Sequence, residues 1–215
     1  MLACGRCPPR LVGSSSSAAL AARVVTSSRS CARPASRCGC SSATARAEAE
    51  LGPGLDLVVG DALDLDLGPA FAGVERVVST LGSRDVHGGG LRTVDLPATA
   101  RLVSAAREAG AARFVLCSTI GAVPTPGVPA HMLEWFAPKG EAEAVLRASG
   151  VPFAILRPGG LHDGPTDDPR MIDCNHVARA LVAALTRDDA LGATFELSNA
   201  RLQRPDADPL LGVRV

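Results

Sequence analysis

The chain has 215 residues, of which 47% are hydrophobic, which is enough for one domain with a real apolar core. Acidic and basic residues number 22 each, so no global field attracts nucleic acid or an anionic membrane surface. No apolar run reaches the roughly 18 residues that a membrane-spanning helix needs. These features exclude the strongly charged and membrane-spanning classes and leave a globular domain.

The first 47 residues differ in composition from the rest of the chain. All 22 acidic residues lie at or after Glu48, whereas residues 1–47 are rich in Arg, Ser and Ala and hold five of the seven cysteines. An Arg- and Ser-rich, acid-poor start is typical of a transit peptide. Four of the cysteines form a CxxC and a distant CxC without a nearby histidine, which is a weak zinc pattern, so we expect no metal. A shifted reading frame is the third interpretation, and in each case we expect this segment to be irregular and disordered.

From residue 48 onward, apolar strands alternate with amphipathic helices. Strands are predicted at 55–61, 74–83, 113–118, 151–160 and 193–198, a loop with a short helix at 63–73, and helices at 88–111, 132–150 and 176–189. Gly110 and Gly150 are expected to end two of the helices. This alternation predicts an α/β fold with a mainly parallel sheet. We place the domain at 48–203 and a tail at 204–215.

Small and hydroxyl-bearing residues follow several of the predicted strands. These strand ends are Gly60-Asp61, Ser79-Thr80-Leu81-Gly82, Ser118-Thr119 and Arg157-Pro158-Gly159. In α/β sheets, ligands bind beyond the carboxyl ends of the strands. Small side chains there allow the close approach of a flat nucleotide, so the four ends together predict a ligand crevice.

Five stretches carry a resemblance to a known family. They are "VVGDALD", "AFAGVERVVSTLGS", "VDLPATARLVSAAREAGAARFVLCSTIGA", "KGEAEAVLRASGVPFAILRPGGL" and "VARALVAAL". Their order and spacing over about residues 50–200 resemble the atypical short-chain dehydrogenase/reductases, in particular the NmrA-like and sugar-epimerase-like group. The resemblance implies a Rossmann-like domain with helices on both faces of the sheet. It also implies NADP or NAD as cofactor, and an oxidoreductase or epimerase-like enzyme that acts on a small molecule.

The resemblance also implies a set of site residues. The cofactor would be bound by Asp61, Thr80, Leu81, Gly82, Ser118, Lys139, Pro158 and Gly159. Lys139, the only lysine in the chain, matches the lysine that hydrogen-bonds the nicotinamide ribose. Ser118 matches the hydroxyl that orients the substrate oxygen, so these two residues are the predicted catalytic pair. A compact ammonium can hold ribose hydroxyls in a way that a planar guanidinium does not easily copy.

Two departures from the family pattern bear on the activity. The tyrosine that precedes the lysine by four residues in the classical reductases is replaced by Trp135, and the chain has no tyrosine. An indole N–H only donates, so it cannot act as the acid and base of a carbonyl reductase. The glycine-rich turn that holds the pyrophosphate is also missing from residues 1–50. The sequence therefore leaves three interpretations open: an enzyme, a dinucleotide-sensing regulator without turnover, and a truncated product with impaired cofactor binding.

A shifted reading frame would account for the missing glycine-rich turn. Residues 37–44, "RCGCSSAT", are compatible with codons that read Val-Arg-Leu-Leu-Val-Arg-Asp from the third base, a plausible second strand of such a domain. We favour a shifted frame or mis-joined exon over residues 1 to about 44, with a transit peptide as the alternative, and an uninterrupted frame in the mature transcript would contradict this hypothesis. We expect a cytoplasmic protein, or a plastid or mitochondrial one if residues 1–47 are a transit peptide. The substrate, the choice between NAD and NADP, and the oligomeric state are not predicted.

Overall fold

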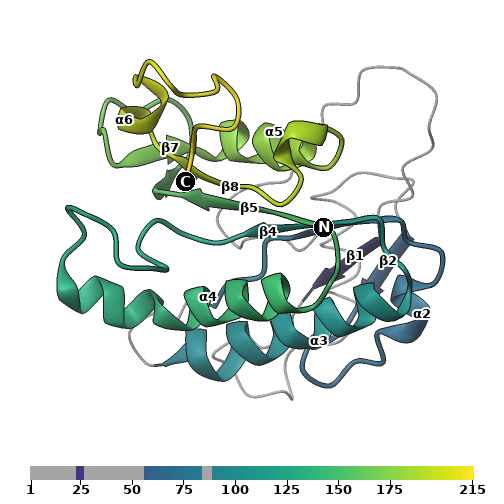
Figure 1. Cartoon of the computed structure of the whole chain (residues 1–215). Helices are drawn as coiled ribbons and strands as arrows, with labels where there is room; N and C mark the ends of the chain where they lie inside the picture. Colours follow the sequence, from purple (N-terminus) through teal and green to yellow (C-terminus); the bar gives the residue numbers. More distant parts are fainter. Residues whose placement is uncertain (1–22, 27–55, 84–88) are drawn as a thin grey trace.

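A parallel sheet with helices on both faces forms the core of the computed structural model (Figure 1). The structure describes residues 23–26, 56–83 and 89–215. The main sheet has the order β3-β4-β5-β8-β9. Its strands are β3 (Arg76–Ser79), β4 (Arg113–Cys117), β5 (Phe153–Pro158), β8 (Thr194–Leu197) and β9 (Val213–Arg214). The first four are mutually parallel and β9 is antiparallel to β8, so the predicted mainly parallel Rossmann-like fold is confirmed.

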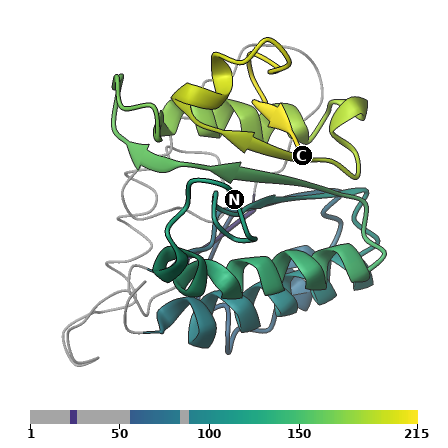
Figure 2. The same cartoon turned by 60° about the vertical axis from the view of Figure 1, so that its left-hand side comes forward.

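Helices cover the two faces of this sheet in separate layers. On one face lie the π-helix η3 (Leu91–Asp95), α3 (Leu96–Glu108) and α4 (Ala130–Ala148), and on the other lie α5 (Cys174–Ala184) and α6 (Asn199–Leu202) (Figures 1 and 2). Two shorter elements are α2 (Gly68–Phe71) and the 3₁₀ helix η4 (Asp188–Ala190). Gly110 and Gly150 have positive φ at the ends of α3 and α4, as the sequence predicts.

Two apolar cores lie on opposite sides of the sheet. Successive side chains of a strand point to opposite faces, so neighbouring residues of β4 contribute to different cores. Phe114 packs with Leu102 of α3 and Leu146 of α4 in the first core, and all three are essentially inaccessible. Val115 belongs to the second core, with Leu181 of α5. Burial on both faces explains why the strands appear in the sequence as continuous apolar runs.

Two further strand pairs lie outside the main sheet. β1 (Arg23–Thr26) pairs in parallel with β2 (Asp56–Val59). β1 falls inside the segment for which we expected irregular structure, and the rest of that expectation lies outside the described residues. β6 (Gly160–His162) and β7 (Met171–Asp173) form a small parallel pair directly after β5. Neither β6 nor β7 is evident in the sequence, because three-residue strands are too short for a periodic pattern.

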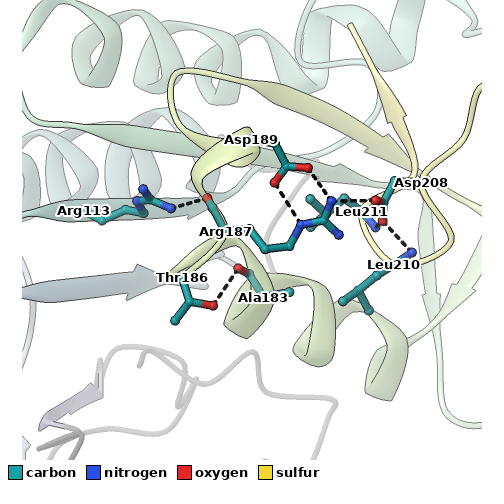
Figure 3. Close-up of polar contacts among 8 residues, drawn as sticks. All are labelled: Arg113, Ala183, Thr186, Arg187, Asp189, Asp208, Leu210 and Leu211. Atoms are coloured by element: carbon teal, nitrogen blue, oxygen red, sulfur yellow. Dashed lines mark hydrogen bonds and ion pairs between the residues drawn. The ribbon is translucent and has the colours of Figure 1, made fainter. Parts of the chain in front are cut away.

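The stretch 204–215, predicted as a tail, returns to the sheet as its edge strand. Leu211 is fully buried in the second core and Val213 of β9 is 3% exposed. The guanidinium of Arg187 donates to the carboxylates of Asp189 and Asp208, which ties this return to the end of α5 (Figure 3). Asp208 in turn accepts hydrogen bonds from the next turn of the backbone. The domain therefore continues beyond the boundary predicted at 203.

Candidate functional site

The single lysine of the chain lies at the carboxyl end of β3. Lys139, on α4, donates from Nζ to the backbone carbonyl of Leu81 at 2.8 Å. The same Nζ lies 2.8 Å from Oδ2 of Asp95, a residue of η3. The Lys139 side chain is 12% exposed, whereas that of Asp95 is completely buried. An ammonium has three protons, and the one hydrogen bond to Leu81 leaves donor capacity for a ligand beside the ion pair with Asp95.

Gly82 provides open space beside this ammonium. The residue is exposed. A methyl group built at Gly82 would lie 3.7 Å from Lys139 Nζ and 3.9 Å from Asp95 Oδ2, which is ordinary contact, and apart from its chain neighbours no other atom of the described residues would lie within 4 Å. Gly82 does not have a positive φ, so its backbone does not require glycine. Neither packing nor backbone conformation explains the missing side chain, and the open space lies where a ligand would reach the ammonium.

The buried carboxylate of Asp95 contacts two groups near the end of β3. Its Oδ1 accepts a hydrogen bond of 2.6 Å from the backbone N–H of Ser83, and its Oδ2 faces Lys139. Burying a carboxylate without a partner is costly, so an ammonium and an N–H are the compensation that this position needs. The charges of Lys139 and Asp95 balance, and the site has no net positive charge from this pair.

A second polar cluster joins the ends of β4 and β5. The hydroxyl of Ser118, just after β4, donates to Oε1 of Glu143 at 2.6 Å. Arg157 of β5 forms a two-pronged pair with the same carboxylate, Nε to Oε1 at 2.8 Å and Nη2 to Oε2 at 2.6 Å. Glu143 is 2% exposed and Ser118 is 6% exposed. The hydrogen bond to Glu143 raises the pKa of Arg157, so the guanidinium keeps its charge in this buried cluster.

The turn after β5 packs against the protein itself. The carbonyl of Pro158 accepts from the backbone N–H of Ile120, and the N–H of Gly159 donates to Leu197. A methyl group at Gly159 would lie 2.1 Å from the carbonyl oxygen of Arg170. Gly159 is therefore required by the close approach of the chain near β7, which is a structural reason for this glycine.

The other predicted site residues lie at strand ends as expected. Asp61 follows β2, and its Oδ1 accepts from the N–H of Leu63 at 3.0 Å, which closes a local turn. Thr80 is half-buried directly after β3. Trp135, in the place of the family's tyrosine, is half-buried with its ring edge-on to that of His131 at 4.8 Å between centroids.

The structure thus joins the predicted residues into two clusters. Lys139, Leu81 and Gly82 come together at the end of β3, and Ser118 joins the β5 end through Glu143. Sequence reasoning missed Asp95 and Glu143, the two buried carboxylates that complete these clusters. For Glu143 a signal exists, since it lies four residues after Lys139 and therefore on the same face of the helix. Asp95 has no comparable signal, because its partner is distant in the sequence.

The described residues hold neither a metal-binding cluster nor a membrane-spanning helix. Among residues 23–26, 56–83 and 89–215, no group of three or more His, Cys, Asp or Glu side chains is placed to hold a metal ion. In the same part of the chain, no helix is both long and apolar enough to cross a membrane.

A mainly parallel sheet with helices on both faces is the arrangement of a Rossmann-like domain, in which ligands bind beyond the carboxyl ends of the strands. The model of the NAD(P)H-binding family matches residues 40–189, which is more than half of the chain. The chain belongs to this NAD(P)H-binding family. Family membership confirms the predicted resemblance and the predicted class of cofactor, NAD or NADP.

Curated relatives share part of this domain. The uncharacterized sugar epimerase YhfK of Bacillus subtilis (strain 168) is 27% identical over 143 residues, 62% of this chain and 67% of the relative. Protein TIC 62, chloroplastic, of Pisum sativum is 35% identical over 109 residues, which is 47% of this chain and 20% of that protein. The chain therefore spans about one fifth of this chloroplast relative.

Solved structures share the fold. A Bacillus halodurans protein provisionally described as an NAD-dependent epimerase/dehydratase superimposes with a TM-score of 0.61, 23% identity and 82% coverage of both chains. MoeE5 in complex with UDP-glucose and NAD gives a TM-score of 0.59 at 18% identity, covering 82% of this chain and 67% of its own. These likenesses support the Rossmann-like architecture.

Proposed function

We propose that this protein binds NAD(P)(H) with a ribose hydroxyl on Lys139 above Gly82, and responds to the dinucleotide without turning it over. The single observation that carries the binding proposal concerns a side chain built at exposed Gly82: among the described residues, and apart from its chain neighbours, only Lys139 Nζ and Asp95 Oδ2 lie within 4 Å of it. A proton of the ammonium that Leu81 does not accept serves a hydroxyl that approaches over Gly82. A nicotinamide dinucleotide supplies such hydroxyls and, where chemistry follows, a hydride.

The residues fit the ribose part of the cofactor better than its pyrophosphate. No G-x-x-G-x-x-G run occurs in residues 1–50, and that turn supplies the backbone N–H groups and helix N-terminus that hold a pyrophosphate. Without it, the affinity rests on hydroxyl and base contacts alone. We therefore propose weak binding of NADPH by residues 1–215.

Three features favour binding without turnover. The Ser118 hydroxyl donates to the buried carboxylate of Glu143, so its proton is directed away from a substrate oxygen. Lys139 already donates to the carbonyl of Leu81 and is ion-paired with Asp95. The chain has no tyrosine to act as acid and base. The enzymatic alternative, an oxidoreductase or epimerase-like activity on a small molecule, draws support from the relative named a sugar epimerase.

Titration of NADPH fluorescence against the wild-type protein, Gly82→Ala and Lys139→Met tests the proposal. Removing a hydrogen bond to a charged group costs about 1.5–3 kcal/mol, so we expect Lys139→Met to bind about tenfold or more weakly. Gly82→Ala should weaken binding comparably, because its methyl group occupies the approach to Nζ. Gly68→Ala, at an exposed glycine on α2, is the matched control and should bind as the wild type does. Equal affinity in all four proteins would overturn the proposal.

Turnover assays separate the two functional classes. NADPH oxidation with a panel of carbonyl compounds, and epimerisation of nucleotide sugars such as UDP-glucose, should both be undetectable while binding is measurable. A rate that Lys139→Met abolishes would favour the enzymatic alternative instead. Mass spectrometry of the native N-terminus tests localisation: loss of an N-terminal peptide would support the plastid interpretation, which the chloroplastic relative also favours.

A further inference from the structure

The carboxylate of Asp95 is fully buried beside the Lys139 ammonium, which is itself 12% exposed. Asp95 contacts two groups at the end of β3, the N–H of Ser83 at 2.6 Å and Nζ of Lys139 at 2.8 Å. With Leu81 as the other acceptor, the ammonium is held from two sides. A free lysine side chain samples many rotamers, and this arrangement removes most of that freedom before a ligand arrives.

We infer that Asp95 is a positioning residue that fixes the Lys139 ammonium beside Gly82 and makes the site selective for a neutral hydroxyl over an anion. This inference rests on the proposed function only for the identity of the hydroxyl, a ribose of the dinucleotide. The contacts of Asp95 stand independently of which ligand binds.

The selectivity follows from the distances at the open position. A Cβ atom built at Gly82 would lie 3.7 Å from the Lys139 nitrogen and 3.9 Å from Oδ2 of Asp95, so the two opposite charges are at similar distances from this position. Coulomb energy falls as the inverse of distance, so the carboxylate offsets much of the ammonium's attraction for a negative charge there. An anion therefore gains little there. A hydroxyl accepts from the ammonium, and its dipole is favourably oriented between the two opposite charges.

A neighbouring ion pair provides a control for the alternative that Asp95 only holds η3 against α4. Arg92 of η3 and Glu141 of α4 form an exposed two-pronged pair, with Nη2 and Oε1 2.6 Å apart. It joins the same two elements as the Asp95–Lys139 pair, two residues away on α4. If Asp95 served only to hold η3 against α4, breaking the Arg92–Glu141 pair would change the accessibility of Lys139 in the same direction as breaking the Asp95–Lys139 pair, but by less.

The uniqueness of Lys139 makes its environment directly measurable. Reductive methylation labels only this side chain and the N-terminal amine, which is an internal standard read by peptide mass spectrometry. Relative to that standard, we expect Asp95→Asn to be methylated about tenfold faster than the wild type, because the buried ion pair no longer holds the ammonium. Glu141→Gln should be labelled at the wild-type rate. Equal rates in wild type and Asp95→Asn would overturn the inference, whether or not NADPH binds.

Selectivity is tested with two small probes, reduced nicotinamide riboside and inorganic phosphate, by NMR titration. Asp95→Asn should lose about tenfold affinity for the riboside and gain affinity for phosphate, because the site becomes positively charged. A loss of affinity for both the riboside and phosphate in Asp95→Asn would contradict the charge argument. If the wild-type protein binds neither NADPH nor the riboside, the proposed function fails while the labelling result still decides the role of Asp95.

A comparison of native and urea-denatured wild-type protein keeps the inference testable if Asp95→Asn does not fold. Lys139 should be methylated several-fold more slowly in the native state than in urea, relative to the N-terminal amine. Absence of this protection would overturn the inference without any substitution.

Discussion

Lys139 and Glu143 extend from the same face of α4, four residues apart, and each ends on a buried partner of opposite charge, the first on helix η3 and the second on strand β5. Lys139 pairs with Asp95 beside the end of β3, and Glu143 pairs with Arg157 at the end of β5. Residues at this spacing are neighbours on one helix face. The helix thereby fixes the relative positions of two strand ends, on which a nucleotide site in this fold depends.

Removing the charge of Glu143 should destabilise the domain strongly. Glu143→Gln leaves Arg157 as an uncompensated buried charge, and breaking a buried pair in this way costs about 3–5 kcal/mol. Urea denaturation measures the free energy of unfolding. Glu141→Gln, which breaks the exposed pair on the same helix, should change it by at most about 1 kcal/mol. A double variant, Glu143→Leu with Arg157→Met, should recover most of the loss, and a failure to recover would contradict this account.

Ser118→Ala should affect stability more than cofactor binding. The substitution removes one of the donors to the buried Glu143 carboxylate, which we expect to cost about 1–3 kcal/mol in unfolding free energy. Its effect on the NADPH dissociation constant should be smaller than that of Lys139→Met. If Ser118→Ala had wild-type stability but severely reduced NADPH binding or turnover, the result would support the catalytic role that the sequence predicts for Ser118.

The two glycines at predicted site positions should respond differently to alanine. Gly159→Ala places a methyl group 2.1 Å from the carbonyl oxygen of Arg170, so the backbone has to shift. Overpacking of this kind costs about 1–3 kcal/mol. Gly82→Ala makes only ordinary contacts and should stay within about 0.5 kcal/mol of the wild type in thermal or urea unfolding. A large loss of stability in Gly82→Ala would show that this position is structural.

The Arg187–Asp208 pair should contribute to stability above acidic pH. Burial alone would raise the pKa of Asp208, but the hydrogen bond from Arg187 and those from the N–H groups of Leu210 and Leu211 lower it overall. A carboxylate whose pKa is lower in the folded state stabilises the fold above its unfolded pKa, and this stabilisation is lost as pH falls through the folded value. We expect Asp208→Asn to lose about 1–2 kcal/mol at neutral pH.

The same variant should show a weaker loss of stability with acidification than the wild type below about pH 4, since one contributing carboxylate is gone. Unfolding monitored by circular dichroism between neutral and acidic pH measures both effects. Identical pH profiles for the two proteins would contradict the assignment.

A glycine-rich strand-turn-helix unit in place of residues 1–47 should raise the affinity for NADPH into the micromolar range. The expected gain comes from backbone N–H groups and a helix N-terminus directed at the pyrophosphate. Fluorescence titration of the chimera and of residues 1–215 measures the difference, with Lys139→Met in both backgrounds as the control. Tight binding by the unaltered chain would contradict the proposal that its phosphate contacts are missing.

Much of the architecture was accessible from the sequence, because burial on both faces makes each parallel strand a continuous apolar run. β3, β4, β5 and β8 and the helices α3, α4 and α5 lie where strand and helix patterns predict them. β6, β7 and β9 were missed, since strands of two or three residues carry no pattern of their own. β9 forms because Leu211 and Val213 reach the second core and Arg187 holds the return, which are contacts between distant residues.

For the site, the sequence by itself determined the class of cofactor and singled out Lys139, through the order of its motifs and the absence of any other lysine. Only the tertiary structure decided what these groups do. Asp95 lies 44 positions before Lys139, and Glu143 meets Ser118 and Arg157 only when helix and sheet pack together. Composition and spacing show which charges the chain has, but what a buried charge does depends on the partner that it contacts in the folded protein.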